Sequence, residues 1–179
     1  MISYQVHYRD LVDSTNTWAK DLAKEGMPEG TICVTDAQTA GKGRRGRTWI
    51  SPKGESIYMS LILRPEILPE QASMLTLVMG LSVVEACEKL YQVDAHIKWP
   101  NDMVINGKKV CGILTEMSLA GSKIDYVIVG TGINVNQSSF AEEIQKTATS
   151  IALEVGHVVD RKELQDAVLE IFAYNYEKF

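Results

Sequence analysis

The dipeptide Asn106-Gly107 limits the possible folds of this chain more than any other short segment. It lies between the apolar runs MVI and KKVCGIL. Asn-Gly favours the positive φ angles that both central residues of a tight hairpin turn require. The two runs are therefore predicted to form antiparallel strands. A chain with such a hairpin is not built from strictly alternating strands and helices, and an α+β domain is expected.

Hydrophobic periodicity predicts the other strands and helices. Predicted strands cover residues 31–38, 57–65 and 124–136, and predicted helices cover residues 13–26, 70–91 and 160–179. In the third strand the residues facing either side of the sheet are apolar, so this strand is expected at the centre of the sheet. In the second helix, the residues predicted to face the core are Leu75, Val78, Leu81, Val84 and Cys87. The expected architecture is a mixed, largely antiparallel β-sheet with helices packed mainly on one face.

The composition is that of a folded domain without an encoded disulfide framework or zinc site. With 179 residues, 45% of them hydrophobic, the chain can form one domain with a substantial core. Cys33, Cys87 and Cys111 are odd in number and form no CxxC pair, and the three histidines lack ligand spacing. The lack of a signal peptide or long apolar run predicts a cytoplasmic protein without membrane contact. The net charge of −5 argues against nonspecific nucleic-acid binding.

Residues 39–56 form a predicted loop that is rich in cations. Lys42, Arg44, Arg45 and Arg47 fall within six residues of an otherwise acidic chain. The glycines between them let the backbone approach a ligand closely, while the cations can hold a carboxylate or a phosphate. Trp49 follows directly, and an aromatic ring beside cations suits a nucleotide. We therefore predict a flexible anion-binding loop, the alternative being a solvated basic surface loop.

The same loop contains a formal GxGxxG match at residues 41–46. In a dinucleotide-binding fold this motif opens a helix whose first amides face the pyrophosphate. Here RTWISPKGES follows, and Pro52 and Gly54 break any helix. A nicotinamide-dependent oxidoreductase is therefore disfavoured. No Walker A sequence is present either.

The sequence AGKGRRGRTW resembles the adenylate-binding loop of biotin protein ligases, GRGRRGRxW, with Lys42 in place of the first arginine. Further blocks follow in the family's order: DSTN at 13–16, KWPND at 98–102, KVCGILTE at 109–116 and VGTGINVN at 129–136. The resemblance implies the fold shared by class II aminoacyl-tRNA synthetases and biotin ligases. It also implies an ATP-dependent enzyme that forms biotinyl-5'-AMP from biotin and ATP, then transfers biotin to a lysine of a biotin carboxyl carrier protein.

The resemblance further implies a biotin pocket and three catalytic cations. The implied catalytic residues are Arg44, Lys98 and Lys109. The implied biotin-binding residues are Ser14, Thr15, Asn16, Gln38, Gly41, Lys42, Gly43, Arg44, Tyr58, Lys109, Gly112, Gly130 and Gly132. The three strand glycines are expected to let the backbone approach the bicyclic ring closely. Taken alone, helix capping explains Ser14 or Thr15 nearly as well. Lys109 taken alone is better explained as a solvated hairpin lysine, and the GILTE sequence that follows favours the site.

An ATP site with magnesium is implied beside the biotin pocket. Its implied residues are Arg44, Arg47, Trp49, Lys98, Asn101, Asp102 and Asn134, and Asp102 is the implied Mg²⁺ ligand. Asn134 is expected to face adenine, with Trp49 stacked near it, whereas Trp99 is expected in the core. Lysine at position 42 keeps the charge of the family's arginine but lacks its planar fork, which puts a bidentate contact there in doubt.

Two alternatives remain open, and the domain organisation is a further expectation. A lipoate-protein ligase shares the fold and the adenylation chemistry, although the KGRRGRTW loop weighs against it. A nucleic-acid-binding module could use the basic loop and Trp49, although the net charge weighs against that. Residues 1–179 are expected to be one catalytic domain, without an N-terminal DNA-binding domain and with the family's C-terminal SH3-like barrel absent or truncated. A homodimer is an alternative to a monomer.

Overall fold

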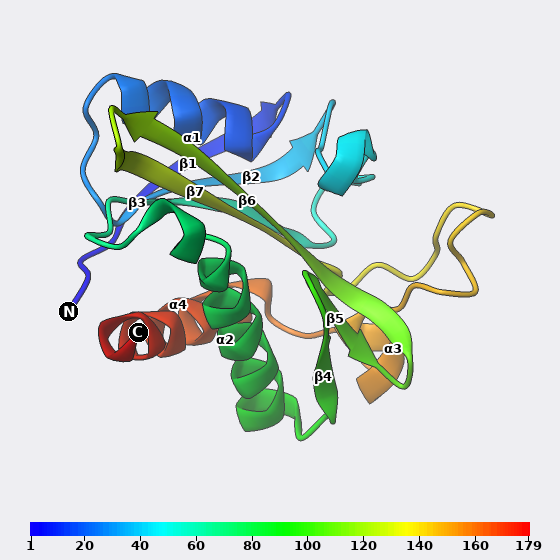
Figure 1. Cartoon of the computed structure of the whole chain (residues 1–179). Coiled ribbons are helices and arrows are strands. Elements are labelled where there is room, and N and C mark those ends of the chain that lie inside the picture. The colour runs from blue at the N-terminus through cyan, green and yellow to red at the C-terminus, as the bar shows by residue number, and fades with distance from the viewer.

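A computed structural model describes all residues from Met1 to Phe179, and one seven-stranded sheet organises it (Figure 1). The strands lie in the order β1-β2-β3-β7-β6-β5-β4. Their bounds are Gln5–Val12 (β1), Thr31–Gln38 (β2), Ile57–Leu63 (β3), Ala95–Lys98 (β4), Asp102–Ile105 (β5), Lys108–Ala120 (β6) and Lys123–Ile133 (β7). Only β1 and β2 pair in parallel, and every other neighbouring pair is antiparallel. The predicted mixed, largely antiparallel sheet is confirmed.

Helices cover both faces of the sheet, three of them on one face. They are α1 (Thr15–Lys24), α2 (Met74–Tyr91), α3 (Ile151–Val155) and α4 (Arg161–Lys178). A large core of 27 buried residues includes side chains from α2, α3 and α4. A second core of eight buried residues, which includes Trp18 and Ala19, packs α1 against the opposite face. Figure 1 shows α1 separated from α2 and α4 by the sheet, so packing on one face is confirmed for all helices except α1.

The hairpin predicted at Asn106-Gly107 joins β5 to β6. Asn106 has a φ of 52° and Gly107 a φ of 75°, and Ile105 pairs with Lys108 across the turn. Positive φ at both central residues is the type I′ geometry that Asn-Gly favours. β7 lies between β3 and β6 with Val127, Ile128 and Val129 fully buried, which confirms the predicted central strand.

Helix α2 forms as predicted, but with a different start and a different buried face. It begins at Met74, after a short 3-10 turn at Pro69–Gln71, rather than at residue 70. Leu81 was predicted to face the core, yet it is 41% exposed, whereas Met79 and Val83 are fully buried. A strict three-residue spacing drifts around a helix of 3.6 residues per turn, so a series of i+3 steps leaves the buried face.

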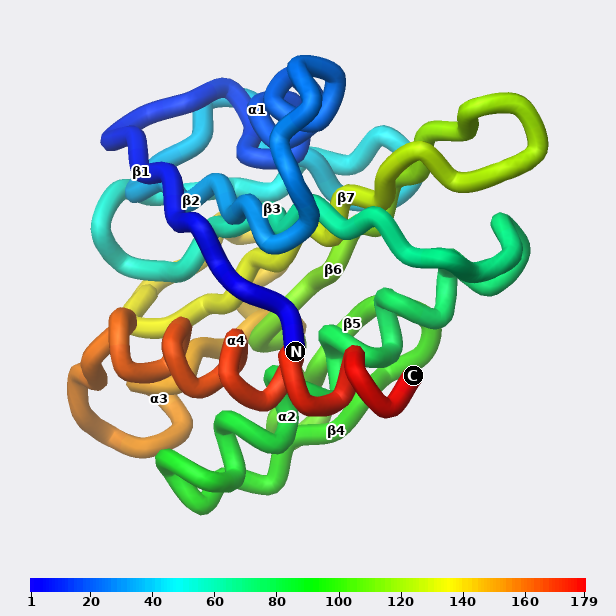
Figure 2. The backbone as a smooth tube through the Cα atoms, turned by 90° about the vertical axis from the view of Figure 1, so that its left-hand side faces the viewer, coloured from blue at the N-terminus to red at the C-terminus, as the bar shows by residue number.

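The N-terminal segment runs across α4, so the two ends of the chain pack together (Figure 2). The Tyr4 hydroxyl donates a hydrogen bond of 2.8 Å to the Leu169 carbonyl, and the Met1 amino group lies 3.8 Å from a Glu177 carboxylate oxygen.

No helix combines the length and the apolar character needed to cross a membrane.

Candidate functional site

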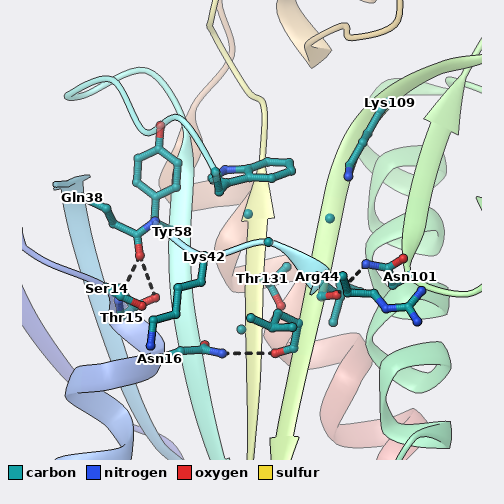
Figure 3. Close-up of a pocket in the computed structure, with 17 residues that line it drawn as sticks. Ser14, Thr15, Asn16, Gln38, Lys42, Arg44, Tyr58, Asn101, Lys109 and Thr131 are labelled. Carbon is teal, nitrogen blue, oxygen red and sulfur yellow. Dashed lines mark hydrogen bonds between the residues drawn. The ribbon is translucent and has the colours of Figure 1, made fainter. Parts of the chain in front are cut away.

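The main pocket lies where the start of α1 and the cationic loop meet the middle of the sheet (Figure 3). Its lining residues are Ser14, Thr15, Asn16, Gln38, Lys42, Gly43, Arg44, Trp49, Tyr58, Asn101, Lys109, Gly112, Ile113, Leu114, Gly130, Thr131 and Gly132. Residues of the four sequence blocks at 13–16, 98–102, 109–116 and 129–136 therefore line one cavity together with the cationic loop at 39–56.

One side of the pocket carries neutral hydrogen-bonding groups, with the Lys42 side chain of the cationic loop beside them (Figure 3). Ser14 caps α1 by accepting a hydrogen bond from the Thr17 amide, which leaves its hydroxyl hydrogen available. Gln38 accepts from the Thr15 amide at 2.9 Å and donates to the Ser51 hydroxyl at 2.9 Å. These two bonds fix the orientation of the Gln38 carboxamide and leave one of its N–H groups free. This side suits a neutral, polar ligand group.

The opposite side of the pocket carries positive charge, as Figure 3 shows for Lys109 and Arg44. The Lys109 ammonium lies 2.9 Å from the Asp102 carboxylate and 5.1 Å from the centre of the Trp49 ring. Asn101 holds the nearby edge of β6, because its side chain donates to the Ile113 carbonyl at 3.1 Å and its own carbonyl accepts from the Ile113 amide. A ligand with an anionic end would place that end here.

The Lys109 backbone is tied to a distant segment. Its amide donates to the Thr147 carbonyl at 2.7 Å, and its carbonyl accepts from the Thr149 amide at 2.9 Å. Asn134 contributes to the same connection, because its side-chain amide donates to the Thr149 carbonyl at 3.1 Å. Asn134 is 6% exposed and does not line the pocket, so its predicted contact with adenine stays a prediction.

The floor of the pocket is the Asn16 side chain, and its hydrogen-bonding capacity is already used. Its oxygen accepts from the Ser60 hydroxyl at 2.5 Å, and its nitrogen donates to Glu116 at 2.9 Å and to the Leu114 carbonyl at 3.3 Å. A Cβ at Gly130 would lie 2.0 Å from the Asn16 oxygen, so only glycine fits beneath it. Asn16 lines the pocket with its polar atoms bonded to the protein, and its contact with biotin stays a prediction.

Glu116 is ionised within this floor. Burial acts to raise the pKa of its carboxyl group, but hydrogen bonds from Lys20 and Asn16, with the charges of Lys20 and Lys42, outweigh burial and lower the pKa from its ordinary value. The Lys20 ammonium lies 2.6 Å from one carboxylate oxygen.

The strand glycines accommodate protein side chains in this structure. A Cβ at Gly132 would lie 2.7 Å from two atoms of the Trp49 ring, and one at Gly112 would lie 2.8 Å from a third. Gly112 and Gly132 are paired across β6 and β7, so they form a flat platform beneath the indole. The ring thus closes one wall of the pocket and links the cationic loop to the sheet.

Replacing Gly132 by alanine is expected to displace the Trp49 ring. Because the added methyl group would overlap the indole, the free energy of unfolding should fall by about 1–3 kcal/mol. Urea denaturation measures this change. In a Trp49→Ala background the same substitution should cost less than about 0.5 kcal/mol, since the overlapping ring is gone. Equal costs in both backgrounds would show that the platform does not support the ring.

Several predicted site residues lie outside the pocket lining. They are Gly41, Arg47, Lys98, Asp102 and Asn134. Lys98 is exposed at the end of β4 and pairs in register with Asp102 on β5. Trp99 was predicted to be in the core, and this is wrong, because its side chain is 77% exposed in the turn between β4 and β5. It lies in the short connection between the edge strand β4 and β5, where nothing covers it.

Asp102 is the one predicted metal ligand, and the donor set around it suits only one kind of metal site. No group of three or more His, Cys, Asp or Glu side chains could hold a metal ion by itself. The Oδ1 atom of Asp102 is buried and accepts no hydrogen bond. Its polar contact is the ion pair with the Lys109 ammonium. A single carboxylate fits Mg²⁺ that is bound mainly through substrate phosphates.

Three polar residues near the pocket escaped the sequence reasoning. Ser51 orients Gln38, while Ser60 and Glu116 orient Asn16. Ser60 lies in the middle of the apolar strand β3, and Glu116 ends the KVCGILTE block. A serine in an otherwise apolar buried run is the one signal that could have indicated Ser60, because a buried hydroxyl needs a partner.

The fold and the two-ended pocket define a small-molecule-binding α+β domain, and comparisons identify its family. Residues 8–134 match the model of the biotin/lipoate A/B protein ligase family. The chain belongs to this family.

Similar proteins and structures agree with that assignment. The bifunctional ligase/repressor BirA of Bacillus spizizenii is 44% identical over 174 residues, which cover 96% of this chain and 54% of that protein. The biotin--[acetyl-CoA-carboxylase] ligase of Paracoccus denitrificans is 38% identical, covering 90% of this chain and 68% of that protein. The Aquifex aeolicus biotin protein ligase, solved with biotin and ATP, aligns with a TM-score of 0.84 at 39% identity, covering 98% of this chain and 71% of that chain. This chain spans about half the length of the BirA relatives it matches.

Proposed function

We propose that this chain is the catalytic part of a biotin protein ligase, which activates biotin with ATP and transfers it to a lysine of a biotin carboxyl carrier protein. The observation that carries the proposal is the two-ended pocket, with Gln38 and Ser14 on one side and Lys109 and Arg44 on the other. Biotin has a neutral ureido ring at one end and a carboxylate at the other. The ring would hydrogen-bond to the amide and hydroxyl groups, and the carboxylate would face the cations.

In the first step the biotin carboxylate attacks the α-phosphate of ATP, and pyrophosphate leaves. Two anions must approach each other, so fixed positive charge lowers the barrier. Lys109 would hold the carboxylate while Arg44 faces the phosphate. Arg47, Lys98, Asn101 and Asp102 would bind the triphosphate at the rim, where Mg²⁺ held by Asp102 would neutralise phosphate charge.

In the second step the acceptor lysine amine attacks the carbonyl carbon of biotinyl-5'-AMP, the amine loses a proton, and AMP leaves. The carbonyl oxygen gains negative charge during the attack. Lys109 is the cation nearest to Asp102 and Trp49, and it would stabilise that charge. Arg44, on the cationic loop, would retain the phosphate end until the carrier arrives.

Lipoate is the alternative substrate within the same family, and the polar side of the pocket favours biotin. The relatives and solved structures named above are biotin ligases. Lipoate ends in an apolar dithiolane ring, which would leave the free Gln38 and Ser14 groups without partners in the pocket. Unpaired polar groups in a buried site reject such an analogue strongly.

Pyrophosphate release tests the proposal. The protein is incubated with ATP, Mg²⁺ and either biotin or lipoate, and the release rate is measured without a carrier and then with a biotin carboxyl carrier protein. We expect release with biotin to exceed that with lipoate by at least about 100-fold. Equal rates with both acids, or no biotin-dependent release, would contradict the proposal.

A further inference from the structure

A charged pair behind the pocket floor connects α1 to the sheet. Glu116 on β6 uses its two carboxylate oxygens for different partners, Asn16 at 2.9 Å and Lys20 at 2.6 Å. Asn16 and Lys20 are four residues apart on α1 and therefore project from the same side of the helix. One carboxylate thus fixes the first turns of α1 against a strand about a hundred residues away in sequence.

These turns of α1 carry the groups that line the neutral side of the pocket. Ser14 and Thr15 line the pocket directly, and the Thr15 amide donates to Gln38. The Ser60 hydroxyl bonds to both Thr15 and Asn16 from beneath, at 2.8 and 2.5 Å. Any movement of Asn16 would therefore change the position of the ring-binding groups.

The Asn16 carboxamide cannot rotate without losing bonds. Its oxygen needs the Ser60 donor, and its nitrogen needs two acceptors, which are Glu116 and the Leu114 carbonyl. If the amide turned over, its nitrogen would face the Ser60 hydroxyl and its oxygen would face the Glu116 carboxylate. Two acceptors facing each other are repulsive, so the charge of Glu116 selects one orientation.

We infer that Glu116 and Lys20 are positioning residues that hold Asn16 and the first turn of α1 in the geometry required to bind the ring of the ligand. The inference rests on the proposed function, in which that ligand is biotin. Neither residue lines the main pocket, although Glu116 lines a second pocket beside the cationic loop, and the contact of the pair with the main pocket runs through Asn16. The pair should therefore affect ligand affinity rather than the chemical step at the cationic side.

Steady-state kinetics of pyrophosphate release test this role. Glu116→Ala removes the acceptor of a charge-assisted hydrogen bond, so the KM for biotin should rise about 10- to 100-fold. The kcat at saturating biotin and the KM for ATP should stay within about twofold, because Arg44 and Lys109 are untouched. Lys24→Met, which removes an exposed cation from the same helix, serves as the control and should leave all three constants unchanged.

A paired substitution separates positioning from a general loss of stability. Glu116→Gln replaces one carboxylate oxygen by an NH₂ group. The remaining oxygen can accept from Asn16 or from Lys20 but not from both, so the new NH₂ group faces the other donor. Adding Lys20→Met removes one donor, and the double variant should recover a biotin KM within about threefold of the wild type. The inference is overturned if Glu116→Ala leaves the biotin KM unchanged, if the biotin and ATP constants rise together with a fall in Tm, or if the double variant shows no recovery.

A measurement without ligand keeps this inference distinct from the proposed function. The two side-chain N–H protons of Asn16 are both hydrogen-bonded, and their NMR signals should move toward the values of a free amide in Glu116→Ala. If wild-type protein fails to bind biotin, the proposed function fails, while the shifted Asn16 signals would still report the positioning network. If these signals do not move, Glu116 does not hold Asn16.

Discussion

Replacing Lys109 by methionine is expected to lower the rate of biotinyl-5'-AMP formation by about 10²- to 10³-fold. The substitution keeps most of the side-chain volume against Trp49 but removes the cation that would face both the biotin carboxylate and the developing oxyanion. Biotin-dependent pyrophosphate release under saturating substrates measures the effect. The predicted loss is in kcat, because the charge acts mainly in the transition state.

The neighbouring Lys108 provides a matched control for this substitution. Lys108 is exposed at the hairpin and does not line the pocket, so Lys108→Met removes the same charge from the same hairpin and should change the rate less than twofold. A Lys109→Met rate within threefold of the wild type would refute the assigned role.

Replacing Arg44 by glycine is expected to release biotinyl-5'-AMP from the pocket before transfer. Loss of a charge-assisted contact to the phosphate should weaken retention of the intermediate by about 10- to 100-fold. The freed mixed anhydride reacts with any exposed lysine, so bystander proteins should become biotinylated. Streptavidin detection of a protein mixture, incubated with the variant, biotin and ATP, measures this labelling.

Arg45 provides the matched control for Arg44. It lies next in sequence, is exposed, and does not line the main pocket. Its φ of 55° means that glycine fits its backbone without strain. Arg45→Gly should therefore label only the cognate carrier. Equal bystander labelling by both variants would show that loop charge in general, rather than Arg44, retains the intermediate.

The strongest local patterns predicted the centre of the sheet. Asn106-Gly107 specified the β5–β6 hairpin because its positive φ angles depend on those two residues alone. The apolar β7 was placed centrally because both of its faces had to be buried. In contrast, β1 was not predicted. It is an edge strand with Val6, Tyr8 and Leu11 more than half exposed, so its sequence lacks a consistent buried face.

Most of the residues that line the pocket could be predicted from the sequence, but their hydrogen bonds could not. The motifs named most of the residues that line the pocket, including Gln38, Arg44 and Lys109. The sequence could not reveal that the hydrogen-bonding groups of the Asn16 side chain are already paired within the protein, because their partners lie 44 to 100 residues away in the chain. The same reasoning misplaced Trp99, since a large aromatic residue is usually buried and only the tertiary structure shows that nothing covers it.

The tie between Lys109 and residues 147–149 uses main-chain atoms on both sides. Hydrogen bonds of this kind do not depend on which side chains the segment carries. Many substitutions between residues 137 and 149 could therefore accumulate while the lysine stays in place. An inserted or deleted residue would instead shift which carbonyl meets the Lys109 amide, so the number of residues in this connection is under stronger constraint than their identity.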